Sequence, residues 1–371
     1  MLRFHSLRVS AITPDAEDAV AIALEVPAEL RATYLGAAGQ HVVVRTRIDT
    51  EEVRRTYSPV NAPGEWPLVI VPRVHAAGRM SRYLAEQLRA GDTLDVLPPN
   101  GSFTPRTHAA RGGSYVAFAA GCGITPVLSV ARALLALPGK RVILFYGNTG
   151  SARAMCLEEL LALKDRYLDR LALHFVMSRE PQEAALYNGR IDAARVREFA
   201  ATLFQPREIA EYFVCGPGDM IEQVGASLRA LGVDGSRIHA EHFSVATAVE
   251  GAGHPAGTAA PVAAPTAPAA APAAAPAGSH AEVTIVMDGR RRSFSMQIDE
   301  TVLDAAARAG IELPFSCRAG VCSTCRTKVV RGEVEMAQNY ALEDWELEQG
   351  YVLACQSRVK SGTLELDYDE K

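Results

Sequence analysis

Four cysteines near the C-terminus have the spacing of metal ligands: Cys317, Cys322, Cys325 and Cys355. The spacing is C-x4-C-x2-C followed by a distant fourth cysteine, which is the plant-type ligand pattern of a [2Fe–2S] cluster. The loop between the first three contains small residues, so backbone N–H groups can approach the sulfurs. A structural zinc site with four thiolates is the alternative, but zinc sites more often pair two C-x2-C units, and only one is present. The pattern therefore indicates a one-electron redox centre.

Two glycine-containing turns in the middle of the chain have features of a nucleotide site. Gly121, Gly123, Thr125 and Pro126 lie between an apolar strand and a helix, where a phosphate can approach the backbone at the helix N-terminus. Proline is tolerated at that point, although the turn departs from G-x-G-x-x-G. Cys215-Gly216-Pro217 ends the last expected parallel strand, and parallel sheets bind ligands at the carboxyl ends of their strands. Each turn alone is a weak signal.

Two stretches in the first hundred residues could bind a second cofactor. Arg55-Thr56-Tyr57-Ser58 lies near a strand end, and strand alternation places Arg55 and Tyr57 on one face. An arginine suits a pyrophosphate, and a tyrosine can cover an aromatic ring. Gly78, Met80 and Ser81 precede a helix, which is again a phosphate-type position. Taken singly, either stretch is more often an ordinary turn.

The elements expected around these motifs predict a multidomain protein. Residues 1–107 contain short β-type runs, which predict a small antiparallel β-barrel. Residues 108–246 alternate strands and helices, as in an α/β nucleotide domain with a parallel sheet. Residues 247–280 are mostly Ala, Pro and Gly and predict a linker. Residues 281–371 predict a small mixed domain that fits the β-grasp of ferredoxins.

Four local elements are predicted more closely. Helical patterns cover Ser81–Leu88 and Pro126–Leu137, the second ending at a Pro-Gly pair. Two β-hairpins are expected, one turning at Asp288-Gly289 and one over Val329–Met336 turning at Arg331-Gly332.

Composition and charge indicate the cell compartment and the class of binding partner. The chain has no apolar run of 18 residues and no signal-peptide core at its start, so we expect neither a membrane span nor export. Seven cysteines in such a chain point to the reducing cytoplasm and to metal or redox work. A net charge of −5 gives no indication of nucleic-acid binding.

The segment from Glu282 to Lys371 has 16 acidic and 11 basic residues. This is a solvated acidic surface or, alternatively, a docking face for an electropositive redox partner.

In this order, the motifs resemble the ferredoxin–NADP reductase superfamily. Arg55 to Ser58 matches its R-x-Y-[ST] flavin signature, and Gly78 to Ser81 matches its flavin diphosphate site. Gly121 to Pro126 and Cys215 to Pro217 match its pyridine-nucleotide signatures. The whole chain except the linker also resembles the reductase subunits of bacterial phenylacetyl-CoA epoxidases. That closer resemblance rests on Phe4–Leu7, Arg54–Ser58, Tyr146–Asn148, Gly189–Asp192, Asn339-Tyr340 and Gly350–Leu353.

The resemblance implies an enzyme that passes electrons from NADPH through FAD and [2Fe–2S] to a di-iron oxygenase acting on phenylacetyl-CoA. The reductase itself would not contact the aromatic substrate. The resemblance assigns hydride-transfer roles to Tyr57, Ser58, Thr125 and Cys215. The cofactor-binding positions that it implies are Arg55, Tyr57, Ser58, Gly78, Met80, Ser81, Gly121, Gly123, Thr125, Pro126, Ser178, Arg179, Gly216 and Pro217. Cys317, Cys322, Cys325 and Cys355 would ligate the cluster.

Ser178-Arg179 follows a predicted strand and decides the expected nucleotide. In NADPH-using relatives a Ser-Arg pair at that point binds the 2′-phosphate, and arginine supplies a charged, planar fork. Glu180 is close but does not directly follow the strand. We therefore expect NADPH over NADH; an ordinary exposed loop is the alternative.

Two other functions compete with this assignment. The chain could serve a Rieske aromatic dioxygenase or another redox acceptor, since the reductase chemistry would be shared. It could also be a redox-sensing iron–sulfur module, but such a module needs no flavin or nucleotide signature.

Overall fold

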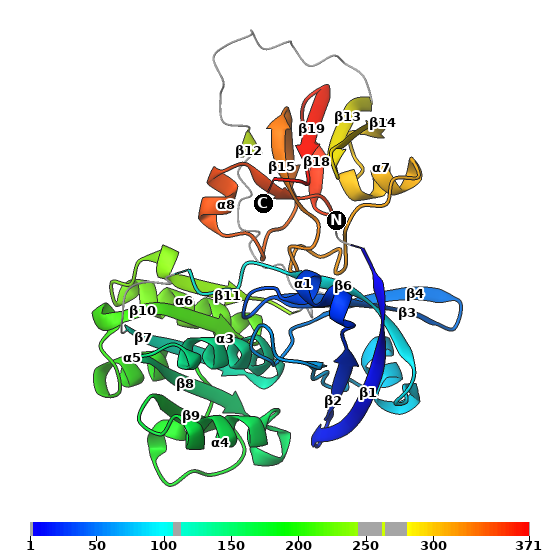
Figure 1. Ribbon diagram of the computed structural model, residues 1–371. Helices are drawn as coiled ribbons and strands as arrows, with labels where there is room; N and C mark the ends of the chain where they lie inside the picture. The colour runs from blue at the N-terminus through cyan, green and yellow to red at the C-terminus, as the bar shows by residue number, and fades with distance from the viewer. Residues whose placement is uncertain (1–2, 107–112, 244–261, 264–279, 371) are drawn as a thin grey trace. The chain divides into compact units, whose positions relative to one another are not determined.

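The computed structural model describes residues 3–106, 113–243, 262–263 and 280–370. These residues form two compact units, one within residues 2–243 and one within residues 244–371 (Figure 1). The first unit holds a β-barrel and an α/β domain, and the second holds a small mixed domain, as the sequence predicts. Apart from residues 262–263 and His280, the predicted linker 247–280 lies outside the described residues.

The barrel of the first unit is a six-stranded antiparallel sheet. In spatial order its strands are β4 (Glu51–Tyr57), β3 (His41–Ile48), β6 (Thr93–Asn100), β1 (His5–Ala16), β2 (Ala19–Glu25) and β5 (Leu68–Ile70). An antiparallel bridge between Pro59 and Ile70 brings the chain after β4 to β5 and nearly closes the sheet. Alternate residues such as Leu7, Val9 and Val44 are fully buried inside it, which is the period-two pattern of strands. The short helix α1 (Arg31–Tyr34) covers one end.

The predicted helix Ser81–Leu88 is wrong in its type and bounds. The chain forms α2 (Arg79–Arg82) and then a π-helical turn, Tyr83–Gln87. Met80, Leu84 and Leu88 all enter the barrel core. These side chains recur every four residues, which exceeds the 3.6 residues of an α-helical turn. The wider π turn accommodates that spacing.

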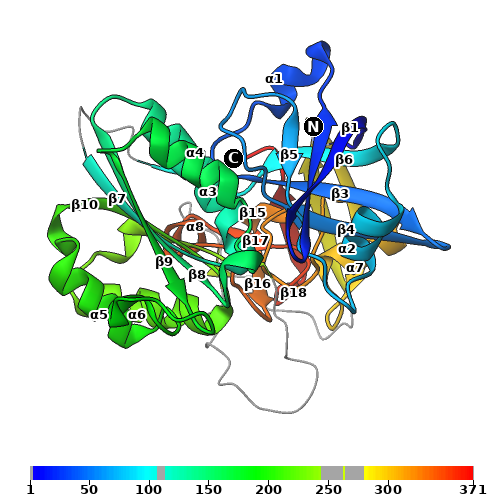
Figure 2. The ribbon, with the colours of Figure 1, turned by 90° about the horizontal axis from the view of Figure 1, so that it is seen from below.

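The α/β domain contains a five-stranded parallel sheet covered on both faces (Figure 2). In spatial order the strands are β11 (Ile238–Glu241), β10 (Ile209–Cys215), β7 (Gly113–Ala120), β8 (Lys140–Asn148) and β9 (Leu171–Met177). The helices are α3 (Ile124–Ala136), α4 (Leu157–Arg166), α5 (Ala193–Thr202) and α6 (Gly218–Ala230). The chain builds β7, β8 and β9 in one direction and then crosses to β10 on the other side of β7. The strand order therefore reverses between β7 and β10, and such a switch point is a usual ligand site.

Strand β7 shows why both faces of this sheet are covered. Tyr115 and Ala117 pack in the cluster that contains α3 and α4. Val116 and Phe118 pack in the cluster that contains α5 and α6. A strand that is apolar on both faces is typical of a parallel sheet between helical layers.

The barrel and the α/β domain share one hydrophobic core. The cluster under α3 also contains barrel residues, among them Ala38, Val60 and Phe103. Phe103 meets Phe213 of β10 edge-to-face, with ring centroids 5.4 Å apart. Burial across this contact fixes the two domains to each other, so motifs on both can form one site.

In its described residues, the second unit contains two sheets and two helices. The larger, mixed sheet has the order β14 (Arg290–Gln297), β13 (His280–Met287), β19 (Thr363–Asp367), β15 (Arg326–Arg331) and β17 (Tyr351–Leu353). The smaller has the order β12 (Val262–Ala263), β16 (Glu333–Met336) and β18 (Ser357–Val359), and the helices are α7 (Val302–Arg308) and α8 (Asp344–Glu348). The predicted hairpin at Asp288-Gly289 is confirmed: both residues have left-handed φ angles, 55° and 68°, as a type I′ turn requires.

The other predicted hairpin, Val329–Met336, is wrong. Strand β15 pairs with β17 and β19, whereas β16 pairs with β18 and β12. Gly332 lies between them with φ at 93°, and a Cβ there would lie 2.3 Å from the carbonyl oxygen of Thr363. Only glycine permits this close approach, which lets the chain leave one sheet and enter another. Strand β12 also lies within the predicted linker.

Candidate functional site

The four predicted ligand cysteines converge from two segments of the second unit. Cys317, Cys322 and Cys325 lie on the loop between α7 and β15, and Cys355 follows β17. Cys317 is half-buried and the other three are buried. The loop takes left-handed φ angles at Arg318, Gly320 and Ser323, of 54°, 74° and 48°. Its backbone is thus shaped around the thiols by conformations that Arg and Ser seldom adopt.

The thiol groups are close enough to share protons. Hydrogen bonds from the Cys322 and Cys355 thiols, followed by the Ala319 amide, lower the pKa of Cys317. The hydrogen bond to Cys317 and burial raise the pKa of Cys322. Hydrogen bonds to Cys317 and Cys325 raise the pKa of Cys355. The hydrogen bonds therefore favour the thiolate form of Cys317 and the protonated form of Cys322 and Cys355. A positively charged metal centre would stabilise all of them as thiolates.

The arrangement of the sulfurs suits two irons better than one zinc. In the described part of the chain, Asp15, Cys156 and Glu159 are the single group of three or more potential ligands whose atoms all lie within 4.8 Å of one another. No three of the four sulfurs are therefore gathered that tightly. Tetrahedral zinc with bonds of about 2.3 Å would hold every pair of sulfurs about 3.8 Å apart. The sulfurs form an open chain of contacts, from Cys322 to Cys317 to Cys355 to Cys325, and such a spread-out set fits a [2Fe–2S] cluster.

The group of Asp15, Cys156 and Glu159 joins the barrel to the α/β domain. The backbone N–H of Cys156 donates to both carboxylate oxygens of Asp15, at 3.1 Å each. Burial and the charges of Asp15 and Glu159 raise the pKa of the Cys156 thiol. A thiol that stays protonated is a poor metal ligand, so we regard the group as a contact between domains.

The predicted flavin signature lies at the end of β4. Arg55 is exposed, and its Nη1 donates to the carbonyl of Arg54 at 2.7 Å. Tyr57 packs against the barrel core, and burial raises the pKa of its hydroxyl. Ser58 is 2% exposed, and its Oγ has no hydrogen-bond partner in the described structure. Buried hydroxyls are almost always paired, so the unpaired Oγ fits a site completed by a polar group of a bound cofactor.

The second flavin stretch is a tight turn before α2. The Ser81 Oγ accepts a hydrogen bond from the amide of His75 at 3.2 Å and donates to the carbonyl of Gly78 at 3.1 Å. A Cβ on Gly78 would lie 2.4 Å from that Oγ. Gly78 and Ser81 therefore fix the shape of the turn. The Met80 side chain is buried in the barrel core, so it can meet a cofactor only through its backbone.

The two predicted pyridine-nucleotide signatures are in contact at the switch point of the parallel sheet. Ala119 and Cys215 are paired neighbours on β7 and β10. A Cβ on Gly123 would lie 2.0 Å from the carbonyl oxygen of Cys215, so this contact requires glycine. Cys215 is fully buried, and burial raises the pKa of its thiol. The two loops thus form a single wall at the carboxyl ends of the strands.

The remaining residues of these signatures shape the turns. Helix α3 begins at Ile124, two residues before the predicted start at Pro126, and Pro126 is buried within it. The Thr125 Oγ1 donates to the carbonyl of Cys122 at 3.1 Å and holds the glycine turn against the helix. A Cβ on Gly216 would lie 2.6 Å from the Met220 Cε, and Pro217 is the N-cap residue of α6.

Ser178 and Arg179 lie at the carboxyl end of β9, two strands from the switch point. Both are exposed, and their amides donate to the carbonyls of Asn148 and Thr149 at 2.9 and 3.0 Å. Within the described ranges, the Arg179 guanidinium has no ion-pair or hydrogen-bond partner. This exposed cation is therefore available to an anionic ligand.

The adjacent carboxylate of Glu180 is held elsewhere. Its Oε2 accepts hydrogen bonds from the amide and the hydroxyl of Ser151, at 2.7 and 2.9 Å. These hydrogen bonds lower the pKa of Glu180. The negative charge is thus engaged with the loop after β8 and does not neutralise Arg179.

Arg73 is a candidate binding residue that the sequence assignment missed. Its Nε lies 3.2 Å from the Asp18 Oδ1, and its Nη2 donates to the carbonyl of Arg153 at 2.5 Å. A Cβ on Gly121 would lie 2.9 Å from its Nη1. The barrel thus places a cation beside the nucleotide turn of the other domain. The signal in the sequence was a single arginine in an otherwise apolar run.

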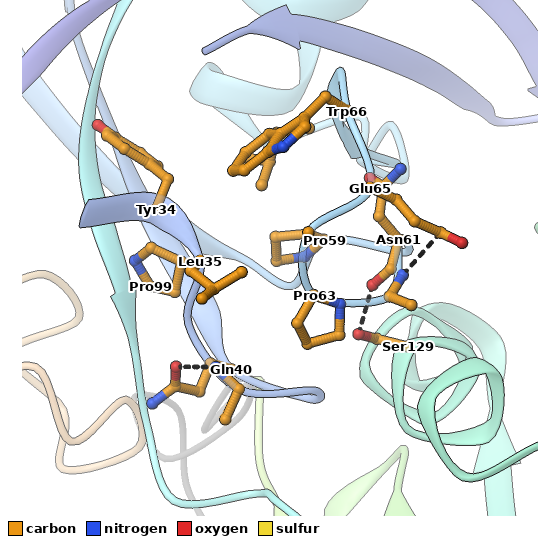
Figure 3. Close-up of a pocket in the computed structure, with 14 residues that line it drawn as sticks. Tyr34, Leu35, Gln40, Pro59, Asn61, Pro63, Glu65, Trp66, Pro99 and Ser129 are labelled. Carbon is orange, nitrogen blue, oxygen red and sulfur yellow. Dashed lines mark hydrogen bonds between the residues drawn. The ribbon is translucent and has the colours of Figure 1, made fainter. Parts of the chain in front are cut away.

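A small pocket of the first unit is lined by residues outside these motifs, although one of them, Pro59, directly follows Ser58 (Figure 3). Its walls come from barrel loops that carry Tyr34, Leu35 and Trp66, and from Ser129 of α3. The Ser129 Oγ donates to the carbonyl of Asn61 at 2.6 Å. None of the predicted cofactor residues lines the pocket, which is a feature of the packing between the domains.

Comparison with known families matches each domain. Residues 7–104 match the oxidoreductase FAD-binding domain, and residues 118–225 match the oxidoreductase NAD-binding domain. Residues 285–360 match the 2Fe-2S iron-sulfur cluster binding domain. Flavin, nicotinamide nucleotide and iron–sulfur cluster are thus the cofactors of this chain, in agreement with the geometry above.

Full-length relatives are components of oxygenases. The chain is 37% identical to one of the subunits of the 1,2-phenylacetyl-CoA epoxidase of Escherichia coli K12, over 100% of this chain and 99% of that protein. The chain belongs to this family of oxygenase reductase components. The reductase is also 32% identical to the ferredoxin reductase component of 3-ketosteroid-9-alpha-monooxygenase from Rhodococcus rhodochrous, over 98% of this chain and 96% of that protein. It is an oxidoreductase that carries electrons from a nicotinamide nucleotide through flavin and [2Fe–2S] to an oxygenase.

The fold of the reductase is found in a solved structure with the same three modules. Phthalate dioxygenase reductase superposes with a TM-score of 0.55 at 22% identity, covering 98% of both chains. The predicted fold class is thereby confirmed. The helices in the described part of the reductase are all too short or too polar to cross a membrane.

Proposed function

We propose that this reductase supplies electrons from NADPH to the di-iron component of a phenylacetyl-CoA epoxidase. The observation that carries the proposal is the 37% identity to a component of such an epoxidase over the full length of both chains. The 32% identity to a 3-ketosteroid monooxygenase component favours a second candidate, the reductase of another oxygenase, such as the Rieske aromatic dioxygenase considered from the sequence. All seven cysteines are free of disulfides, which suits work in the cytoplasm.

We assign the roles of the residues from their positions. Bound flavin would convert a two-electron hydride into single electrons for the cluster. Arg55, Gly78, Met80 and Ser81 would hold the flavin diphosphate, Met80 through its backbone. Tyr57 would cover the flavin ring, and the unpaired Ser58 Oγ would hydrogen-bond a polar atom of that ring. Both hydroxyls would stay protonated near neutral pH. Burial raises the pKa of Tyr57, and a serine hydroxyl does not ionise there.

The nucleotide would bind at the switch point of the sheet. Gly121, Gly123, Thr125 and Pro126 would bring the start of α3 against its phosphates. Gly216 and Pro217 would form the opposite wall, and Cys215 would lie beside the nicotinamide. Ser178 and Arg179 would bind the 2′-phosphate of NADPH. Cys317, Cys322, Cys325 and Cys355 would ligate the cluster.

The choice of NADPH is supported by two features at the end of β9. Arg179 is exposed without a carboxylate partner, and Glu180 is turned to Ser151. Arg179→Ala should lower the ratio of kcat/KM for NADPH to that for NADH by about 10- to 100-fold, since hydrogen bonds to charged groups contribute about 1.5–3 kcal/mol. Arg207→Ala, an exposed arginine at the opposite end of β10, is the matched control. Equal ratios in both variants would exclude this 2′-phosphate site.

Reconstitution tests the oxygenase. The purified reductase would be combined with the oxygenase subunits of a phenylacetyl-CoA epoxidase and, separately, with a Rieske oxygenase. We expect NADPH consumption coupled to product formation with the first and uncoupled consumption with the second. Coupled turnover with only the Rieske oxygenase would replace the proposed acceptor and leave the reductase function intact.

A further inference from the structure

One side-chain amide reaches a ligand sulfur directly. The Nε2 of Gln356 lies 3.6 Å from the Sγ of Cys355, in the range of a hydrogen bond to sulfur. A donated hydrogen bond stabilises negative charge on the sulfur that accepts it.

The same amide is tied to the opposite side of the cysteine group. Its Nε2 also donates to the carbonyl of Arg318 at 2.9 Å. Arg318 lies in the ligand loop with φ at 54°, one residue after Cys317. The Gln356 side chain packs close to the loop as well, since a Cβ on Gly320 would lie 3.3 Å from its Cγ. Gln356 therefore links the fourth cysteine to the loop that carries the other three.

Backbone amides supply the comparable donors on the other side of the group. The Cys317 amide donates to the Cys322 Sγ at 3.5 Å, and the Ala319 amide donates to the Cys317 Sγ at 3.4 Å. Those donors belong to the backbone, and substitutions other than proline leave them in place. The bond from Gln356 can be removed by changing one residue, so its effect can be measured.

Solvent reaches this side of the cysteine group through a pocket. Cys355 and Gln356 line it together with Asp304, Arg318 and Arg358. Cys355 is only 6% exposed, so little of its surface is open to water while Gln356 is in place. An alanine at position 356 would admit water as a substitute donor, whereas leucine would remove the donor and still fill the space.

From these contacts we infer that Gln356 is a positioning residue that raises the reduction potential of the cluster through the Cys355 sulfur. The inference rests on the proposed ligation of [2Fe–2S] by the four cysteines. A reduced cluster carries one more negative charge than an oxidised one. A hydrogen bond to a ligand sulfur therefore stabilises the reduced form more, and its loss makes the cluster harder to reduce.

The test is an anaerobic redox titration of the full-length protein, followed by the EPR signal of the reduced cluster. Gln356→Leu should shift the equilibrium against reduction by up to about tenfold, which equals about 59 mV for one electron. Gln356→Glu keeps the shape, replaces the donor by a carboxylate and should lower the potential further. Gln349→Leu, an exposed glutamine after α8, is the matched control and should leave the potential unchanged.

The possible outcomes separate a failure of this inference from a failure of the cluster assignment. Lower potentials in both Gln356 variants, with an unchanged control, support the inference. Potentials equal to that of the unmodified protein in both variants would refute it while leaving the cluster assignment intact. An unmodified protein without an EPR signal of [2Fe–2S] would overturn the cluster assignment and this inference together. If the leucine variant does not retain a cluster, Gln356→Met, which also lacks the donor and adds no charge, takes its place.

Discussion

Gly123 has backbone angles that any residue can adopt, but there is no room beside it for a side chain. Its φ and ψ angles, −60° and −9°, lie in the helical region that alanine prefers. A Cβ built there would lie 2.0 Å from the Cys215 carbonyl oxygen and 2.4 Å from its carbonyl carbon. Real Cβ atoms do not approach other atoms within 3.0 Å. Alanine would therefore push the backbones of the two nucleotide turns apart by about 1 Å.

The expected cost can be estimated from these distances. Overpacking of this kind costs about 1–3 kcal/mol, and alanine brings no gain in helix propensity because Gly123 is the N-cap residue of α3. Gly123→Ala should thus destabilise the first unit by about 1–3 kcal/mol. A displacement of 1 Å at a reacting geometry can cost about 10²-fold in rate, so flavin reduction by NADPH should slow by a similar factor.

The assay combines urea unfolding with stopped-flow measurement of flavin reduction. Gly225→Ala is the matched control, because Gly225 lies within α6 and its Cβ would meet only the flexible end of Arg229, at 3.4 Å. We expect that variant to be slightly more stable and to reduce flavin at the unmodified rate. If Gly123→Ala behaved like Gly225→Ala in both measurements, the contact between the two turns would not restrict the nucleotide site.

Three further predictions concern other parts of the molecule. Ser58→Ala removes a buried hydroxyl that has no protein partner, so the stability of the flavin-free protein should change little while flavin reduction slows; an unchanged stopped-flow rate would contradict the proposed bond to flavin. Burial, followed by the charge of Lys164, lowers the pKa of His174 below its ordinary value of 6.5. The unfolded chain therefore binds the proton first, and the stability contributed by the neutral ring is complete above pH 6.5 and is lost as the pH falls from 6.5 through the folded-state pKa. His174→Gln should flatten the dependence of urea-unfolding free energy on pH over that range, and an unchanged slope would refute this. Arg326→Met leaves Glu346 fully buried without its cation and should destabilise the second unit by about 3–5 kcal/mol. The exposed pair of Arg291 is the control, since Arg291→Met should cost little, and equal thermal loss of cluster absorbance in both variants would contradict the difference.

Local sequence patterns predicted the parts of the fold that depend on local interactions. The Asp288-Gly289 pair predicted its turn because few residues accept two left-handed φ angles in succession. The cysteine spacing likewise predicted a loop whose sulfurs converge, since three ligands are close in sequence.

Features that depend on distant partners could not be predicted in this way. The pairing of β15 with β17 and β19 is decided by strands that follow it in the chain, so a hairpin with β16 was the reasonable local expectation. At the site, each motif was found, but the contact of Gly123 with Cys215 joins residues on two different strands of the sheet. The approach of Arg73 to Gly121 joins two domains, and no local pattern encodes it.

The distribution of the hydrophobic clusters has a consequence for how such reductases arise. One cluster contains residues of both the barrel and the α/β domain, so neither of these can be exchanged without rebuilding the surface of the other. Among the described residues, the cluster of the second unit draws only on residues from Ala281 to Tyr368. A gene segment that encodes this unit carries everything that its core requires. Recombination can therefore attach the iron–sulfur module to a different flavoprotein, or remove it, without a matching change elsewhere in the core.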